Sequence, residues 1–113
     1  MQASEVILLA NQAKQEHVNI DAIACKVLEQ YPIKRAALFG SAARGDMHSH
    51  SDIDMLVEFL PGTPGLEFFG LRVDLEEAFD RNVDLITFNA LQKAKPDFAQ
   101  AVEREARVIY EYI

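Results

Sequence analysis

Residues 38–57 read LFGSAARGDMHSHSDIDMLV and join the ends of two predicted strands through two short polar motifs. The apolar segment 33–39 is short and ends abruptly at Gly40-Ser41, which predicts a strand followed by a short helix. Free N–H groups at a helix start attract anions, the glycine lets the backbone approach a ligand, and the serine hydroxyl can donate to a phosphate oxygen. Taken alone, such a pair is more often a plain turn glycine followed by a helix cap than a phosphate site.

Asp52 and Asp54 are two residues apart on the second predicted strand, 52–59, so their side chains should point to the same face. The opposite face is apolar and should pack into the core through Ile53, Met55 and Val57. Two carboxylates on one face repel each other unless a cation or hydrogen-bond donors lie between them. An isolated Asp-x-Asp is typical of a solvated strand edge, but Mg²⁺ also prefers such oxygens and leaves positions open for phosphate.

Asp84 interrupts the apolar run of a third predicted strand, 83–88, which we expect to be buried. An acid in such a run is rarely buried without a partner, and two interpretations stay open. One is a salt bridge to Arg81 or Arg35. The other is a third carboxylate beside the first two, where two bound metals would clamp the attacking and leaving oxygens of an in-line displacement.

The rest of the pattern alternates helices and strands. It predicts an α/β (α+β) domain with helices packed on a small mixed sheet. The acids between residues 74 and 80 are expected to form a solvated helix face. The predicted helix starts are Ser4, Asn19 or Asp21, Thr63, Asn89 and Pro96, and residues 107–112 are predicted to form a final strand.

The chain has 113 residues and a net charge of −7, which predicts a single globular domain, 1–113. The clustered cations of a nucleic-acid surface are missing, so we expect no bulk nucleic-acid binding. The single cysteine, Cys25, suits a reducing compartment and is expected to be a small packing residue. No apolar run reaches the about 18 residues of a membrane span, and residues 1–10 lack the features of a signal peptide. We therefore expect a cytoplasmic protein without a membrane partner.

Gly40-Ser41, ten residues, and then Asp52-x-Asp54, with Arg44 between them, resembles the signature of the DNA polymerase β-type nucleotidyltransferase superfamily. The chain is most similar to the minimal nucleotidyltransferases, the MntA-like antitoxins that pair with HEPN-domain toxins. The resemblance covers about Ile33 to Tyr112. It leaves residues 1–32 as an N-terminal helical extension of a core at 33–112.

The resemblance also implies roles for individual residues. A glycine–serine pair would bind the triphosphate of ATP, and three carboxylates would hold two Mg²⁺ ions. The third carboxylate would also help to deprotonate the acceptor, and the motif arginine would either lie near the phosphates or brace the loop. The glycine–serine pair is Gly40 and Ser41, and the motif arginine is Arg44. The three carboxylates are Asp52, Asp54 and, as the third, Asp84.

The activity that the resemblance implies is Mg²⁺-dependent transfer of AMP from ATP to a tyrosine hydroxyl of a HEPN-type toxin. Two alternatives stay open. One is an antitoxin that neutralises its toxin by binding alone, for which the net negative charge suits a basic partner. The other is transfer to a small molecule of the aminoglycoside type, although the chain has no room for a second substrate-binding domain. Apolar positions near the N-terminus suggest a homo- or hetero-oligomeric interface.

Two histidines and two tyrosines are weaker candidates. His48 and His50 lie in the loop before the aspartates, where solvated side chains are favoured over nucleotide contacts, and two histidines are too few for a zinc site. Tyr110 and Tyr112 are expected to pack against the sheet or line its edge.

Overall fold

The computed structural model of the chain describes residues 12–48 and 51–112, with side chains described from Ile20 onward. The predicted helix start at Ser4 and the side chain of His50 lie outside these residues. None of the described helices combines the length and the apolar character needed to cross a membrane. The described elements are α2 (Gln12–Leu28), β1 (Ile33–Phe39), α3 (Gly40–Arg44), β2 (Ile53–Phe59), α4 (Leu66–Phe79), β3 (Val83–Thr87), α5 (Phe88–Gln92), α6 (Pro96–Glu105) and β4 (Arg107–Glu111).

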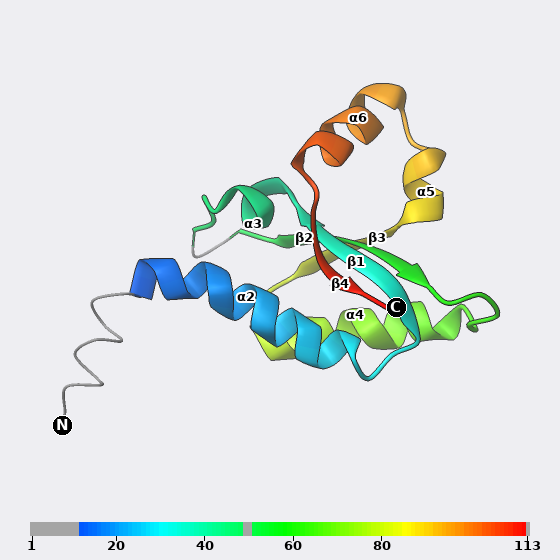
Figure 1. Cartoon of the computed structure of the whole chain (residues 1–113), viewed down its shortest axis with the longest axis horizontal. Helices are drawn as coiled ribbons and strands as arrows, with labels where there is room; N and C mark the ends of the chain where they lie inside the picture. The colour runs from blue at the N-terminus through cyan, green and yellow to red at the C-terminus, as the bar shows by residue number, and fades with distance from the viewer. Residues whose placement is uncertain (1–11, 49–50, 113) are drawn as a thin grey trace.

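The strands form one mixed sheet in the order β3-β2-β1-β4, which confirms the predicted fold class. Strand β1 is antiparallel to both β2 and β4, whereas β2 and β3 are parallel and are connected by α4. The helices α2 and α4 lie side by side below the sheet in Figure 1, and α5 and α6 lie above it. The sheet is therefore the middle layer between two pairs of helices.

Side chains along β2 point alternately to the two faces of the sheet, so the strand contributes to the core on both sides. Ile53, Met55 and Val57 are buried on the α2/α4 side, as the sequence predicts. Leu56 points to the other side, where it joins the cluster that contains Leu91 of α5 and Val102 of α6. Asp54 is two residues before Leu56 and so lies on this second face, at the start of the strand.

The predicted cap at Asn19 or Asp21 is wrong, because α2 continues through both residues. The Asp21 carboxylate instead accepts a hydrogen bond from Arg107 Nη1 of β4, at 2.5 Å. Ile20, between the two predicted caps, is itself buried. A tertiary ion pair thus replaces the local capping bond.

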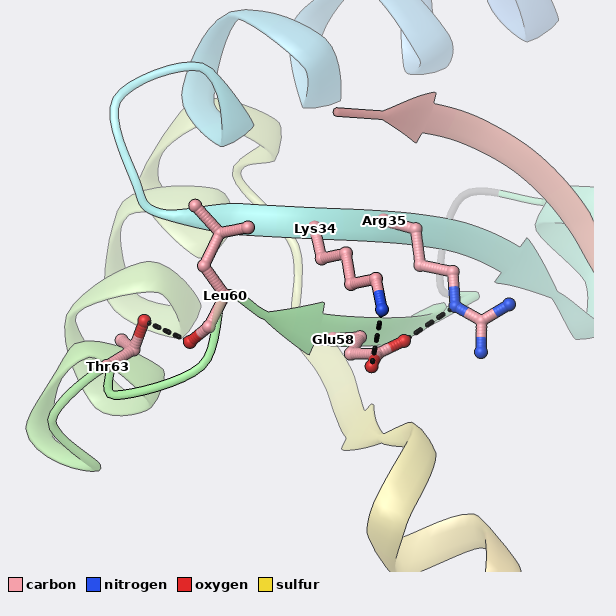
Figure 2. A network of polar contacts seen from close by, with 5 residues as sticks. All are labelled: Lys34, Arg35, Glu58, Leu60 and Thr63. Carbon is pink, nitrogen blue, oxygen red and sulfur yellow. Dashed lines mark hydrogen bonds and ion pairs between the residues drawn. The ribbon is translucent and has the colours of Figure 1, made fainter. Parts of the chain in front are cut away.

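The next two predicted helix caps are each displaced by two residues along the chain. Helix α4 begins at Leu66, and the Thr63 hydroxyl donates to the Leu60 carbonyl at 2.7 Å, within the turn that follows β2 (Figure 2). At α5 the capping residue is Thr87, which accepts from the N–H three residues later, so Asn89 lies inside the helix. The third strand consequently ends at Thr87, one residue earlier than predicted. Pro96 opens α6 as predicted.

Glu58 of β2 forms ion pairs across the central strand pair. Its carboxylate lies 2.7 Å from Arg35 Nε and 3.7 Å from Lys34 Nζ, as Figure 2 shows. Arg35 and Glu58 are cross-strand partners, and the guanidinium also lies 4.0 Å from the Phe88 ring centre. The ion pair found for Arg35 is therefore with Glu58 and not with Asp84.

Two acids of α4 form specific hydrogen bonds, so the prediction of a wholly solvated acidic face is wrong. Asp74 accepts from the Tyr31 hydroxyl at 2.5 Å, and Glu76 accepts from the Val83 N–H at 3.1 Å. The first bond connects α4 to the turn after α2, and the second connects it to β3. Burial and this hydrogen bond raise the pKa of Tyr31 to about 12.

Candidate active site

The glycine–serine pair and the aspartates gather at one end of the sheet. Phe39, the last residue of β1, pairs with Asp54, and Asp54 pairs with Asp84 on the parallel strand β3. Neighbouring strands are about 5 Å apart, so in-register side chains on one face are close neighbours. Asp52 immediately precedes β2, and Gly40 begins α3 immediately after β1. Three separate segments thus bring the predicted residues together.

Gly40 lies against the Asp54 side chain. Its φ angle is +66°, and a β-carbon at this position would lie 2.4 Å from Asp54 Oδ2. Both the backbone conformation and the close approach therefore require glycine. The predicted strand-to-helix transition is present, although α3 is only five residues long.

A polar pocket of about 440 Å³ lies in front of Asp54. The motif serine, the motif arginine and two of the predicted aspartates contribute to its walls. The complete lining is Ser41, Arg44, Asp46, His48, Ser51, Asp52 and Asp54. His48 is exposed at this wall, whereas the sequence places it only in a solvated loop.

Asp84 is exposed, so the prediction of a buried third strand is wrong at this residue. Its side chain lies on the other face of the sheet from Val83 and Leu85, near the start of the edge strand β3, and the sequence pattern alone does not reveal that this face is open there. The neighbouring residues Val83 and Leu85 are buried on the α2/α4 side. Asp84 therefore presents its carboxylate beside Asp54 on the opposite face of the sheet.

The carboxyl group of Asp54 is held in an unfavourable environment for its charge. Partial burial is the largest cause, followed by the carboxylates of Asp84 and Asp52, and together they raise its pKa from 3.8 to about 6. The Arg44 guanidinium acts in the opposite direction but does not cancel the shift. Such a shifted acid among other acids is typical of a functional site.

The raised pKa of Asp54 predicts how the stability of the metal-free protein depends on pH. Between pH 3.8 and about 6 the folded state binds this proton more tightly than the unfolded state. Raising the pH through this window should therefore lower the free energy of unfolding of the wild type relative to Asp54→Asn, with no further change above it. Urea denaturation of both proteins in a chelating buffer measures this difference. Parallel pH curves for the two proteins would contradict it.

Arg44 connects the pocket wall to α6. Its Nε lies 3.1 Å from Asp46 Oδ2, and its Nη1 lies 3.1 Å from Glu105 Oε2. The arginine thus braces the loop and lines the pocket at the same time. Sequence reasoning missed Glu105, because no motif connects the end of the last helix to this loop.

Arg81 braces the other side of the pocket. Its Nη1 donates to the His48 carbonyl at 3.0 Å and to the Ser51 carbonyl at 3.3 Å. From the sequence, Arg81 is expected only as a possible partner of Asp84. Because these bonds are to backbone carbonyls, no side-chain pattern in the sequence predicts them.

The aspartates fit a hard divalent cation that completes its shell with substrate. Among the residues that the structure describes, no group of three His, Cys, Asp or Glu side chains is placed to hold a metal by itself. Mg²⁺, however, usually takes one or two carboxylates together with phosphate oxygens and water. Asp54 and Asp84 are in register, and Asp52 is close enough to raise the pKa of Asp54. A cation would relieve this repulsion.

The other candidate residues lie away from the pocket. The Cys25 thiol donates to the Ile109 carbonyl at 3.2 Å, and burial raises its pKa, in agreement with a packing role. Tyr110 packs against the core beside α2, and Tyr112 is exposed just after the edge strand β4.

Comparison with known proteins gives consistent similarities. A protein-family model described as "Polymerase beta, Nucleotidyltransferase" matches residues 23–112. A Methanocaldococcus jannaschii protein provisionally named a protein adenylyltransferase is 37% identical over 83 residues, which cover 71% of this chain and 89% of that protein. The protein adenylyltransferase MntA of Thermococcus cleftensis is 34% identical over 82 residues, which cover 73% and 78% of the two chains.

A solved structure is also similar. It is a crystal structure of a toxin–antitoxin with AMP-PNP, with a TM-score of 0.64 and 26% sequence identity. The match covers 81% of this chain and 73% of that chain. The likeness thus extends over most of the chain.

Proposed function

The chain belongs to the polymerase β nucleotidyltransferase family, and from this we propose that it is a protein adenylyltransferase that acts as the antitoxin of a HEPN-type toxin. The reaction is transfer of AMP from ATP to a hydroxyl group of the toxin, with a tyrosine as the acceptor. Two relatives that are 34% and 37% identical carry the name protein adenylyltransferase, one of them provisionally. The similar toxin–antitoxin structure with AMP-PNP supports the adenine nucleotide and the kind of partner.

The observation that carries this proposal is the in-register pair Asp54 and Asp84 beside the start of α3. Two carboxylates so close together destabilise the empty site, which fits a role in binding a cation and phosphate. Gly40 has no side chain to fill the space in front of Asp54. The pocket is polar and open, as expected for a charged ligand.

The site residues divide between binding and chemistry. The Gly40 backbone and the Ser41 hydroxyl bind the triphosphate, and Arg44 at the same wall contacts its negative charge. Asp52, Asp54 and Asp84 would hold two Mg²⁺ ions, which supply neutralisation of the phosphate charge when bound. Asp84 of β3 is more exposed than Asp54 of β2, so an incoming acceptor reaches Asp84 from solvent.

The transfer step needs no residue of this chain to form a covalent bond. The acceptor hydroxyl oxygen attacks the α-phosphorus of ATP, and Asp84 accepts the proton of that hydroxyl. The bond between the α-phosphorus and the oxygen that bridges to the β-phosphorus breaks. Pyrophosphate leaves, and AMP remains on the acceptor. Positioning and charge neutralisation are the main contributions of the protein.

Intact-mass spectrometry of the toxin tests the proposal. The purified HEPN-type partner is incubated with this protein, Mg²⁺ and ATP, and separately with the other three nucleoside triphosphates. We expect the toxin mass to rise by one or more adenylate groups with ATP and with none of the other nucleotides.

The result also decides between the two kinds of antitoxin. A stable complex without added mass, with any nucleotide, would overturn the transferase and leave inhibition by binding. Added mass on a purified aminoglycoside, and none on the toxin, would move the activity to a small molecule.

A further inference from the structure

Arg44 is held from two sides by carboxylates of different origin. Asp46 is two residues away in the chain and lines the pocket together with Arg44. Glu105 is the last residue of α6, a helix that packs on the sheet face opposite α2 and α4. The Arg44–Glu105 contact of 3.1 Å therefore connects the pocket wall to a distant part of the chain.

The position of Glu105 is unfavourable for α6 itself. The carbonyl groups at a helix C-terminus carry a partial negative charge, so an acid there costs helix stability. A residue that conflicts with its local structure usually serves another part of the fold. For Glu105 that part is the Arg44 guanidinium.

We propose that Glu105 is a positioning residue for nucleotide binding, because it holds the Arg44 guanidinium at the pocket wall with N–H groups left for the triphosphate. This inference rests on the proposed function. Arginine has five N–H donors, and the two contacts to Asp46 and Glu105 use only two of its nitrogens. A guanidinium that is already held loses less rotamer freedom when phosphate arrives.

Glu105 has a second, opposite effect. As a negative charge near the pocket it also repels the triphosphate, and its removal would then strengthen binding. Positioning through Arg44 predicts that removal weakens binding instead. The sign of the change in affinity therefore separates the two effects.

Isothermal titration of the full chain alone, with ATP and Mg²⁺ and without toxin, measures this affinity. We expect Glu105→Gln to raise the dissociation constant about tenfold, within the range of direct side-chain couplings. Glu105→Asp keeps the charge but shortens the reach, so it should also weaken binding. Glu103→Gln is the matched control, because it removes an exposed acid of the same helix and should leave the affinity unchanged.

A double-mutant cycle shows whether Glu105 acts through Arg44. In an Arg44→Gln background, Glu105→Gln should no longer weaken ATP binding, and only the gain from the removed repulsion should remain. Both side chains are substantially exposed, 49% for Arg44 and 36% for Glu105, so the substitutions leave the core intact. Melting temperatures of the variants check this.

Three results would overturn the inference. They are unchanged affinity in Glu105→Gln, tighter binding in that variant, and an equal weakening of ATP binding by Glu105→Gln in the Arg44→Gln background. Wild-type protein that binds no ATP would overturn the proposed function as well. Equal ATP binding by wild type and variants, with intact transfer, would remove only the role of Glu105.

Discussion

Asp54→Asn is expected to lower AMP transfer by at least ~10³-fold, since loss of a charge-neutralising ligand costs several kcal/mol in the transition state. The same substitution should raise the melting temperature of the metal-free protein at neutral pH. The reason is that the amide removes a half-buried charge that Asp84 and Asp52 repel. Loss of activity together with gain of stability distinguishes a functional residue from a structural one.

The measurement combines initial rates of toxin modification with thermal unfolding followed by circular dichroism. Asp97→Asn is a matched control, because it makes the same chemical change at an exposed residue in the first turn of α6. It should leave the rate unchanged. A variant at Asp54 with wild-type transfer would refute its catalytic role, and a lower melting temperature would refute the electrostatic account.

Gly40→Ala is expected to reduce transfer roughly 10²-fold, the size of effect that a displacement of about 1 Å at a reacting group produces. The added β-carbon would lie 2.4 Å from Asp54 Oδ2, so the carboxylate has to move. The positive φ angle adds about 1–3 kcal/mol of backbone strain for a non-glycine residue. The variant should therefore be both less active and less stable.

Gly62→Ala separates these two causes. Gly62 has a similar φ angle of +84°, but a β-carbon there meets nothing within 4 Å. It should share the strain, measured as a lower free energy of unfolding in urea, and retain full transfer. Equal losses of activity in both variants would mean that strain alone explains the effect at Gly40.

Much of the fold follows from local patterns. The apolar segment before Gly40 predicts the bounds of β1 without error, and the alternation after Asp52 predicts β2 to within one residue. The face that carries Ile53, Met55 and Val57 is also predicted correctly. These features depend on side-chain size and on a period of two, which neighbouring residues in the chain determine.

The helix starts show where local patterns fail. Thr63 and Asn89 have the chemistry of caps, yet the Thr63 hydroxyl bonds within a turn and Thr87 caps α5 instead. Asp21 instead forms an ion pair with Arg107, which is distant in the sequence. Competing local hydrogen bonds at Thr63 and Thr87, and a tertiary ion pair at Asp21, decide which of several suitable side chains forms the cap.

By itself, the sequence determined the local features that the proposed site uses: a glycine–serine pair at a strand end, and aspartates two apart on one strand face. Only the tertiary structure decided that Asp84 is exposed, because that depends on which parts of the two faces of the edge strand β3 are covered. It also decided that Glu105 and Arg81 brace the pocket. Strand order and side-chain contacts between distant segments depend on packing of the whole chain, and no short stretch of residues encodes them.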